Sequence, residues 1–127
     1  MPTQEILRDE WKDFFQDFTR FHQGWIVAFD VFSYEMGAQR GTEGMPFEAI
    51  FVEEEKDGRE SIELFFGERP EPHLTHTITA AKRVRFESEG ESEVLQIEDE
   101  DDTTVLMSFR RSFLPAKVSY GALTEWQ

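Results

Sequence analysis

The sequence contains no cysteine. This excludes a disulfide framework, a thiolate zinc site and a cysteine nucleophile. The sequence also lacks a run of 18 apolar residues, so we expect no transmembrane helix. The first ten residues mix charges and lack the apolar segment of a secretory signal, which predicts a cytoplasmic protein.

Basic residues are scarce, with 13 Lys and Arg against 27 Asp and Glu, and the formal net charge is −14. Nucleic acids and anionic membranes are therefore poor partners, because both are polyanions. The small share of lysine suggests a surface adapted to high salt, where a Debye length of about 3 Å screens acidic repulsion. An ordinary acidic surface is the alternative.

The chain is nevertheless suited to folding, because hydrophobic residues make up 39% of it and aromatic residues 14%. Its 127 residues predict a single domain over 1–127. We find no internal repeat and no linker that would divide it. We expect a monomer.

Residues 3–23 form one predicted amphipathic helix. Thr3 is a suitable N-cap, and Gly24 stands where a left-handed residue ends a helix. Apolar side chains at helical spacing fall on one stripe, namely Leu7, Trp11, Phe14, Phe15, Phe18 and Phe21. A stripe this aromatic predicts that the helix packs onto the core.

From Trp25 the apolar pattern takes a period of two, which predicts strands within 25–110. Trp25–Met36 is expected to be one long strand, followed by a loop over Gly37–Gly44. Phe47–Glu54 and Ser61–Phe66 form a predicted hairpin around Lys56-Asp57-Gly58. Four further strands are expected, over Leu74–Thr79, Arg83–Ser88, Ser92–Glu98 and Thr104–Arg110.

These elements predict an α+β fold, in which the N-terminal amphipathic helix packs on an antiparallel meander of about seven strands. Such a sheet is expected to be strongly curled or to form a partial barrel. Residues 111–127 are expected to be an irregular tail. Its aromatic residues, Tyr120 and Trp126 among them, either pack on the body or serve a partner.

Several short motifs occur in a characteristic order. They are Trp11…Phe14…Phe18-Thr19-Arg20-Phe21-His22-Gln23-Gly24-Trp25, Met45-Pro46-Phe47, His76-Thr77-Ile78-Thr79-Ala80, Leu95-Gln96-Ile97-Glu98 and Val105-Leu106-Met107-Ser108-Phe109-Arg110. Over about residues 11–121 the chain resembles a bacterial family of small proteins catalogued only as a domain of unknown function. The chain departs from the family near Ala81, where a proline is expected, and at Asp101-Asp102, where a glycine is expected. The resemblance implies a shared fold and brings no activity.

The candidate pocket residues are Arg20, His22, Trp25 and His76. His22 lies within the apolar stripe of the helix, and Arg20 and Trp25 flank it, so the group could line a pocket where helix meets sheet. The structural alternative is that His22 is partly buried and bonded to the backbone near the helix C-terminus, with Trp25 in the core.

We expect no catalytic residue, no metal and no cofactor. His73 and His76 lie three apart, and a strand places such residues on opposite faces, so they rarely share an ion. The acidic run Glu98–Asp102 lacks the alternation and the glycine of a calcium loop and is expected to be a solvated hairpin tip. Phosphate-loop, dinucleotide and serine-nucleophile motifs are absent. Arg83 and Arg85 share a strand face and could form one basic patch with Arg110 and Arg111 if their strands lie close, but cross-strand pairing with glutamates is expected instead.

Two functional hypotheses follow. The first is a non-enzymatic binding or accessory protein of the cytoplasm, which acts on a protein partner through an exposed face or a sheet edge. The second is a small-molecule binder or enzyme with a pocket between helix and sheet around His22. A deep cavity with converging polar groups near His22 would favour the second hypothesis, and a filled core would favour the first.

Overall fold

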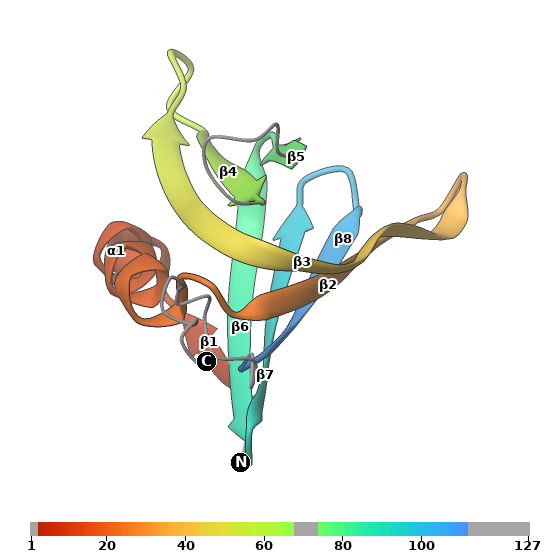
Figure 1. Ribbon diagram of the computed structural model, residues 1–127. Coiled ribbons are helices and arrows are strands. Elements are labelled where there is room, and N and C mark those ends of the chain that lie inside the picture. The colour runs from red at the N-terminus through yellow and green to blue at the C-terminus, as the bar shows by residue number, and fades with distance from the viewer. Residues whose placement is uncertain (1–2, 68–73, 112–127) are drawn as a thin grey trace, which may run out of the picture.

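The computed structural model describes residues 3–67 and 74–111 (Figure 1). A three-residue 3-10 turn, Arg8–Glu10, precedes the single α-helix of this part, α1 (Trp11–His22). The strands are β1 (Gln4–Ile6), β2 (Ile26–Ser33), β3 (Gly37–Glu54), β4 (Glu60–Phe66), β5 (Leu74–Ile78), β6 (Ala81–Glu89), β7 (Ser92–Asp99) and β8 (Thr104–Arg110).

These strands form one antiparallel sheet in the order β1-β6-β7-β8-β2-β3-β4-β5. β2 to β5 make one meander and β6 to β8 another, and the pairing of β8 with β2 joins the two. The two end strands are β1 and β5, so the sheet is open and not closed into a barrel. A helix on an antiparallel sheet confirms the α+β prediction.

The sheet changes direction along β3, which Figure 1 shows as a long curved strand. Up to Pro46 this strand pairs with β2, and from Phe47 onward it pairs with β4. The bend brings β4 into contact with β6, although the two strands are not neighbours in the sheet. The sheet is therefore strongly curled, and its inner face encloses the core.

Helix α1 covers the edge of β3 that the bend leaves without a strand partner. The Thr19 hydroxyl accepts a hydrogen bond from Ile50 N at 3.1 Å and donates one to Ile50 O at 3.3 Å. The Gln23 side-chain amide donates to Glu48 O at 3.2 Å. These bonds satisfy backbone groups that an open edge would offer to another chain.

Helix α1 begins at Trp11, eight residues after the start predicted for the helix over 3–23, so this prediction was wrong at its N-terminus. Gln4–Ile6 instead pair with β6 as the edge strand β1. Trp11 Nε1 donates a hydrogen bond to Ile6 O at 2.9 Å, which holds the turn between strand and helix. These residues form a strand because the edge of β6 supplies backbone hydrogen-bond partners for them. The sequence pattern around residues 4–6 gives no sign of that distant strand. At the other end, Gly24 has φ +87°, as expected for a residue that follows a helix.

The apolar stripe of α1 is narrower than predicted. Trp11, Phe15, Phe18 and His22 are buried, whereas Phe21 is 68% exposed. Phe21 lies about 80° around the helix from Trp11, since each residue turns by about 100°. It therefore falls beside the sheet and not against it. Leu7, which precedes the helix, is also exposed.

The loop predicted over Gly37–Gly44 is wrong, because these residues form the first part of β3 and pair with β2. The predicted strand Trp25–Met36 ends earlier, at Ser33. Tyr34–Met36 make the turn, in which Met36 N donates to Ser33 Oγ at 3.1 Å and Gly37 has φ +67°. An exposed hairpin is held by its backbone ladder, so its arms need no apolar pattern.

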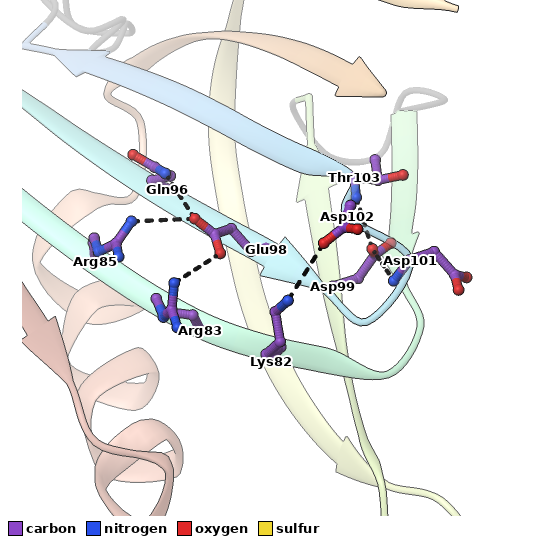
Figure 2. A network of polar contacts seen from close by, with 9 residues as sticks. All are labelled: Lys82, Arg83, Arg85, Gln96, Glu98, Asp99, Asp101, Asp102 and Thr103. Atoms are coloured by element: carbon purple, nitrogen blue, oxygen red, sulfur yellow. Dashed lines mark hydrogen bonds and ion pairs between the residues drawn. The ribbon is translucent and has the colours of Figure 1, made fainter. Parts of the chain in front are cut away.

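The remaining strands lie close to where the sequence pattern predicts them. β8 matches the predicted Thr104–Arg110, and β4 pairs with the second part of β3 as predicted for the hairpin around Lys56-Asp57-Gly58. In the β7–β8 turn, Asp99 Oδ1 accepts hydrogen bonds from Asp101 N at 2.8 Å and Thr103 N at 2.9 Å (Figure 2). Asp102 has φ +64° there, which explains why a glycine is the expected residue at this turn. The tail residues Tyr120 and Trp126 lie outside the described residues.

Candidate functional site

The side chains of the sheet separate into two sets. One set points to the core beneath α1 and includes Val27, Phe29, Leu95, Ile97 and Met107. The alternate residues point to the opposite side, which we call the outer face. It is defined by Arg83 and Arg85 of β6, Gln96 and Glu98 of β7, Thr104 and Leu106 of β8, and Asp30 and Phe32 of β2.

The strand register sets these residues in rows across the outer face. Arg83, Glu98, Thr104 and Phe32 are opposite one another on four successive strands. Arg85, Gln96, Leu106 and Asp30 form the adjacent row. Residues far apart in the sequence are thereby fixed within one surface.

Glu98 is the centre of a polar network on this face (Figure 2). Its carboxylate accepts hydrogen bonds from Arg83 Nη1 at 3.2 Å, Arg85 Nη1 at 3.1 Å and Gln96 Nε2 at 3.2 Å. Its side chain is 19% exposed. Two guanidinium groups therefore hold one half-buried carboxylate in place, which confirms the predicted cross-strand pairing of Arg83 and Arg85.

The β2–β3 hairpin carries three large exposed apolar side chains. Phe32 is 38% exposed, Tyr34 89% and Met36 64%. Figure 1 shows this hairpin projecting from the sheet on the side opposite α1. We call these three residues the hairpin tip. Large exposed apolar side chains grouped on one short segment of a folded domain make that segment a candidate interaction site.

Two hollows lie on either side of Phe32. One, which we call the Phe32 groove, has a volume of about 350 Å³ and is lined by Phe32, Ser33, Tyr34, Glu98, Asp102 and Thr104. The other has a volume of about 380 Å³ and includes the ion pair of Asp30 and Arg40 in its lining. The ring of Phe32 thus forms a ridge between two shallow concave surfaces.

Of the four predicted pocket residues, the structure brings His22 and Trp25 together. Their ring centroids are 4.5 Å apart, and the imidazole also stacks on Phe18 at 3.8 Å. His22 Nδ1 donates to Phe18 O at 2.9 Å, and Nε2 bonds to the carboxylate of Glu93 on β7. His22 is 8% exposed, and both of its ring nitrogens are engaged within the protein.

Arg20 and His76 lie elsewhere. Arg20 is exposed and pairs with Asp17 at 3.1 Å on the same helix. His76 is on β5, with its ring 5.4 Å from that of Phe29, and burial holds the pKa of its imidazole below the usual range. A groove of about 280 Å³ does lie between α1 and β3, but its described lining residues, such as Lys12, Phe15 and Val52, include none of the four.

The described residues contain no group of three or more His, Asp and Glu side chains placed to hold a metal ion. No helix in this part of the chain is both long enough and apolar enough to cross a membrane. His73 lies outside the described residues.

Sequence reasoning did not single out the hairpin tip or the Phe32 groove. The face pattern of β2 correctly separates Phe32 from the buried Val27 and Phe29. One local signal for the tip is present, because Tyr34 and Met36 lie within three residues of Gly37, a residue typical of hairpin turns. The groove itself depends on the β7–β8 turn lying beside β2, which no local pattern reveals.

Fold and site together define a small α+β protein. Its helix packs on the inner face of an open, curled antiparallel sheet, and one hairpin carries exposed aromatic side chains. The chain belongs to a family of unknown function, DUF5335, whose match covers residues 2–117. This confirms the resemblance to a family known only as a domain of unknown function. No curated protein and no solved structure matches the chain.

Proposed function

We propose that the protein is a non-enzymatic binding or accessory protein of the cytoplasm, which docks a protein partner through its outer face. The observation that supports this proposal is the hairpin tip, where Phe32, Tyr34 and Met36 are exposed and the first two also line a groove. Burying such side chains in a partner contributes about 1.5–3 kcal/mol each. Aromatic residues, methionine and arginine are also the residue types enriched in protein interfaces.

The surroundings of the tip fit an interface. The paired Arg83, Arg85 and Glu98 form a rigid polar border on one side of Phe32, and Asp30 with Arg40 forms a second border. An apolar centre with a charged rim is the usual arrangement of a protein-binding surface. His22, the centre of the alternative pocket, is instead fixed by Phe18 and Glu93. The docking function is therefore the better supported of the two, with the protein acting as a monomer.

Replacing the tip tests the proposal. A tagged Phe32→Thr, Tyr34→Ser double variant is expected to retain at least about tenfold less of the partner than the wild type, because interface aromatic residues contribute about 2 kcal/mol or more. The measurement is affinity capture from a lysate of the source organism in high-potassium buffer, quantified by mass spectrometry. Phe21→Ala is the control, because Phe21 is equally aromatic and 68% exposed but lies on α1. If the double variant and the control retain the same proteins as the wild type, the proposal is wrong.

We also propose that the acidic surface is adapted to high salt. The net charge of −14 produces self-repulsion, and salt screens it. Raising KCl from about 0.1 M to about 2 M is expected to raise the melting temperature by about 5 °C or more, which corresponds to about 1–2 kcal/mol. Thermal melts followed by circular dichroism measure this change.

The charge explanation has its own control. A variant that carries Asp13→Asn, Glu53→Gln and Glu91→Gln removes three exposed charges, and its melting temperature should depend less steeply on KCl. A melting temperature that does not respond to KCl in the wild type contradicts the proposal.

A further inference from the structure

The lining of the Phe32 groove has a distinct chemistry. Its described residues supply two aromatic rings from Phe32 and Tyr34 and two carboxylates from Glu98 and Asp102, with hydroxyls from Ser33 and Thr104. None of these described lining residues is basic. Aromatic faces and carboxylates both attract cations, the first through the ring quadrupole and the second through charge.

Glu98 is oriented before any ligand arrives. Arg83, Arg85 and Gln96 each donate one hydrogen bond to its carboxylate, which has about four acceptor positions. One position remains for a further donor. Each arginine donates one of its five N–H groups to Glu98, and neither arginine is among the described residues that line the groove.

Asp102 is held on the other wall by the geometry of the β7–β8 turn. Its backbone is fixed in the left-handed region, and Asp99 binds the amides on both sides of it, those of Asp101 and Thr103. Its carboxylate is 61% exposed and has one described cationic neighbour, Lys82 at 3.5 Å. The whole turn, from Asp99 to Asp102, carries four acidic residues.

From this lining we propose that the Phe32 groove binds an arginine or lysine side chain from a basic segment of the partner protein. The proposal rests on the docking function argued above and specifies the partner's chemistry. The guanidinium or ammonium group lies against Phe32 and Tyr34 and between the carboxylates of Glu98 and Asp102. At contact distance, where salt screens charges least, the carboxylates of the groove attract a basic segment, and a net charge of −14 gives a second copy of this chain no such attraction.

Short peptides test the cation directly. The probe is acetyl-Gly-Gly-Arg-Gly-Gly-amide, and its matched control replaces arginine with citrulline, which has nearly the same shape but no charge. Titrating each into the full-length ¹⁵N-labelled protein, we expect the arginine peptide to shift the amide signals of Phe32, Tyr34 and Thr104. The citrulline peptide is expected to bind at least about fivefold more weakly, because it lacks both the charge and the cation–π attraction.

Variants locate the effect. Tyr34→Ser and Asp102→Asn should each weaken arginine-peptide binding by about threefold or more. Phe21→Ala and Glu91→Gln remove an exposed aromatic residue and an exposed carboxylate elsewhere, and both should bind like the wild type. The peptide shifts in wild type should also decrease as KCl is raised.

Three results would overturn the proposal. They are equal binding of the arginine and citrulline peptides, shifts spread over acidic turns such as 53–57 and 89–91, and no shifts at all. The capture experiment separates these failures from a failure of the docking function. If the hairpin-tip variant loses the partner while the arginine peptide does not bind, the docking face stands and only its preference for a cation is wrong.

Discussion

Gly41→Ala is expected to lower the free energy of unfolding by about 3 kcal/mol, at the upper end of the usual cost of overpacking a core. A Cβ atom at position 41 would lie within 2.5 Å of Cε1 and Cε2 of Phe29 and closer still to Cζ. The ring cannot move aside, because it is 2% exposed and stacked on Phe66 at 5.0 Å. Urea unfolding followed by circular dichroism measures the loss.

Two further variants isolate this cause. Gly44→Ala lies on the same strand, where the added Cβ would meet Ile26 Cγ2 at 3.3 Å, and we expect it to cost less than about 1 kcal/mol. Introducing Gly41→Ala into a Phe29→Leu background should cost less than in the wild type, since the smaller side chain leaves room. If Gly41→Ala costs the same in both backgrounds, contact with the Phe29 ring is not the reason.

The register explains why a glycine is needed at this point. Phe29 pairs with Thr42 and Asp30 pairs with Arg40, so Gly41 is the extra residue of a β-bulge in β3. The bulge lets the ring of Phe29 lie directly over the backbone of the neighbouring strand. The sequence shows only a glycine in a polar stretch, which is why this segment is predicted as a loop.

Elements with strong local patterns are predictable from this sequence, and elements held by distant partners are not. β8 alternates buried Val105, Met107 and Phe109 with more exposed residues, and its bounds follow from that pattern alone. β1 spans three residues, and their partners on β6 lie about 80 residues later, so nothing in its own sequence distinguishes it from the start of a helix. The order in which the two meanders join is likewise absent from local patterns.

The same distinction applies to the candidate site. Period-two alternation places Phe32 on a face different from Phe29, and this much is readable from the sequence. The Phe32 groove also needs Glu98 and Asp102, which lie more than 60 residues along the chain and reach Phe32 only because β8 pairs with β2. For His22 the sequence leaves two interpretations open, because a polar residue in an apolar stripe can line a pocket or make a buried contact between helix and sheet, and its bonds to Phe18 and Glu93 agree with the second.

The contact between His22 and Glu93 ties the end of α1 to β7. The carbonyl of Phe18 can only accept a hydrogen bond, so Nδ1 of His22 carries a hydrogen. The other ring nitrogen, Nε2, bonds to the Glu93 carboxylate. The side chains are 11% and 20% exposed, respectively, so water replaces either partner poorly. Removing one member leaves a buried polar group without its partner, which costs more than the intact pair contributes.

Glu93→Ala is accordingly expected to lower the free energy of unfolding by about 2–3 kcal/mol, measured by urea unfolding. Glu91→Ala, an exposed acid of the same hairpin, should change it by less than about 0.5 kcal/mol. His22→Phe keeps a ring stacked between Phe18 and Trp25 but loses both hydrogen bonds. Without His22, the Glu93→Ala substitution breaks no contact with the imidazole. The loss in free energy of unfolding of the double variant should therefore be about 1–2 kcal/mol smaller than the sum of the two single losses. Strictly additive losses would show that the two side chains stabilise the fold independently, and His22 would then act through ring packing alone.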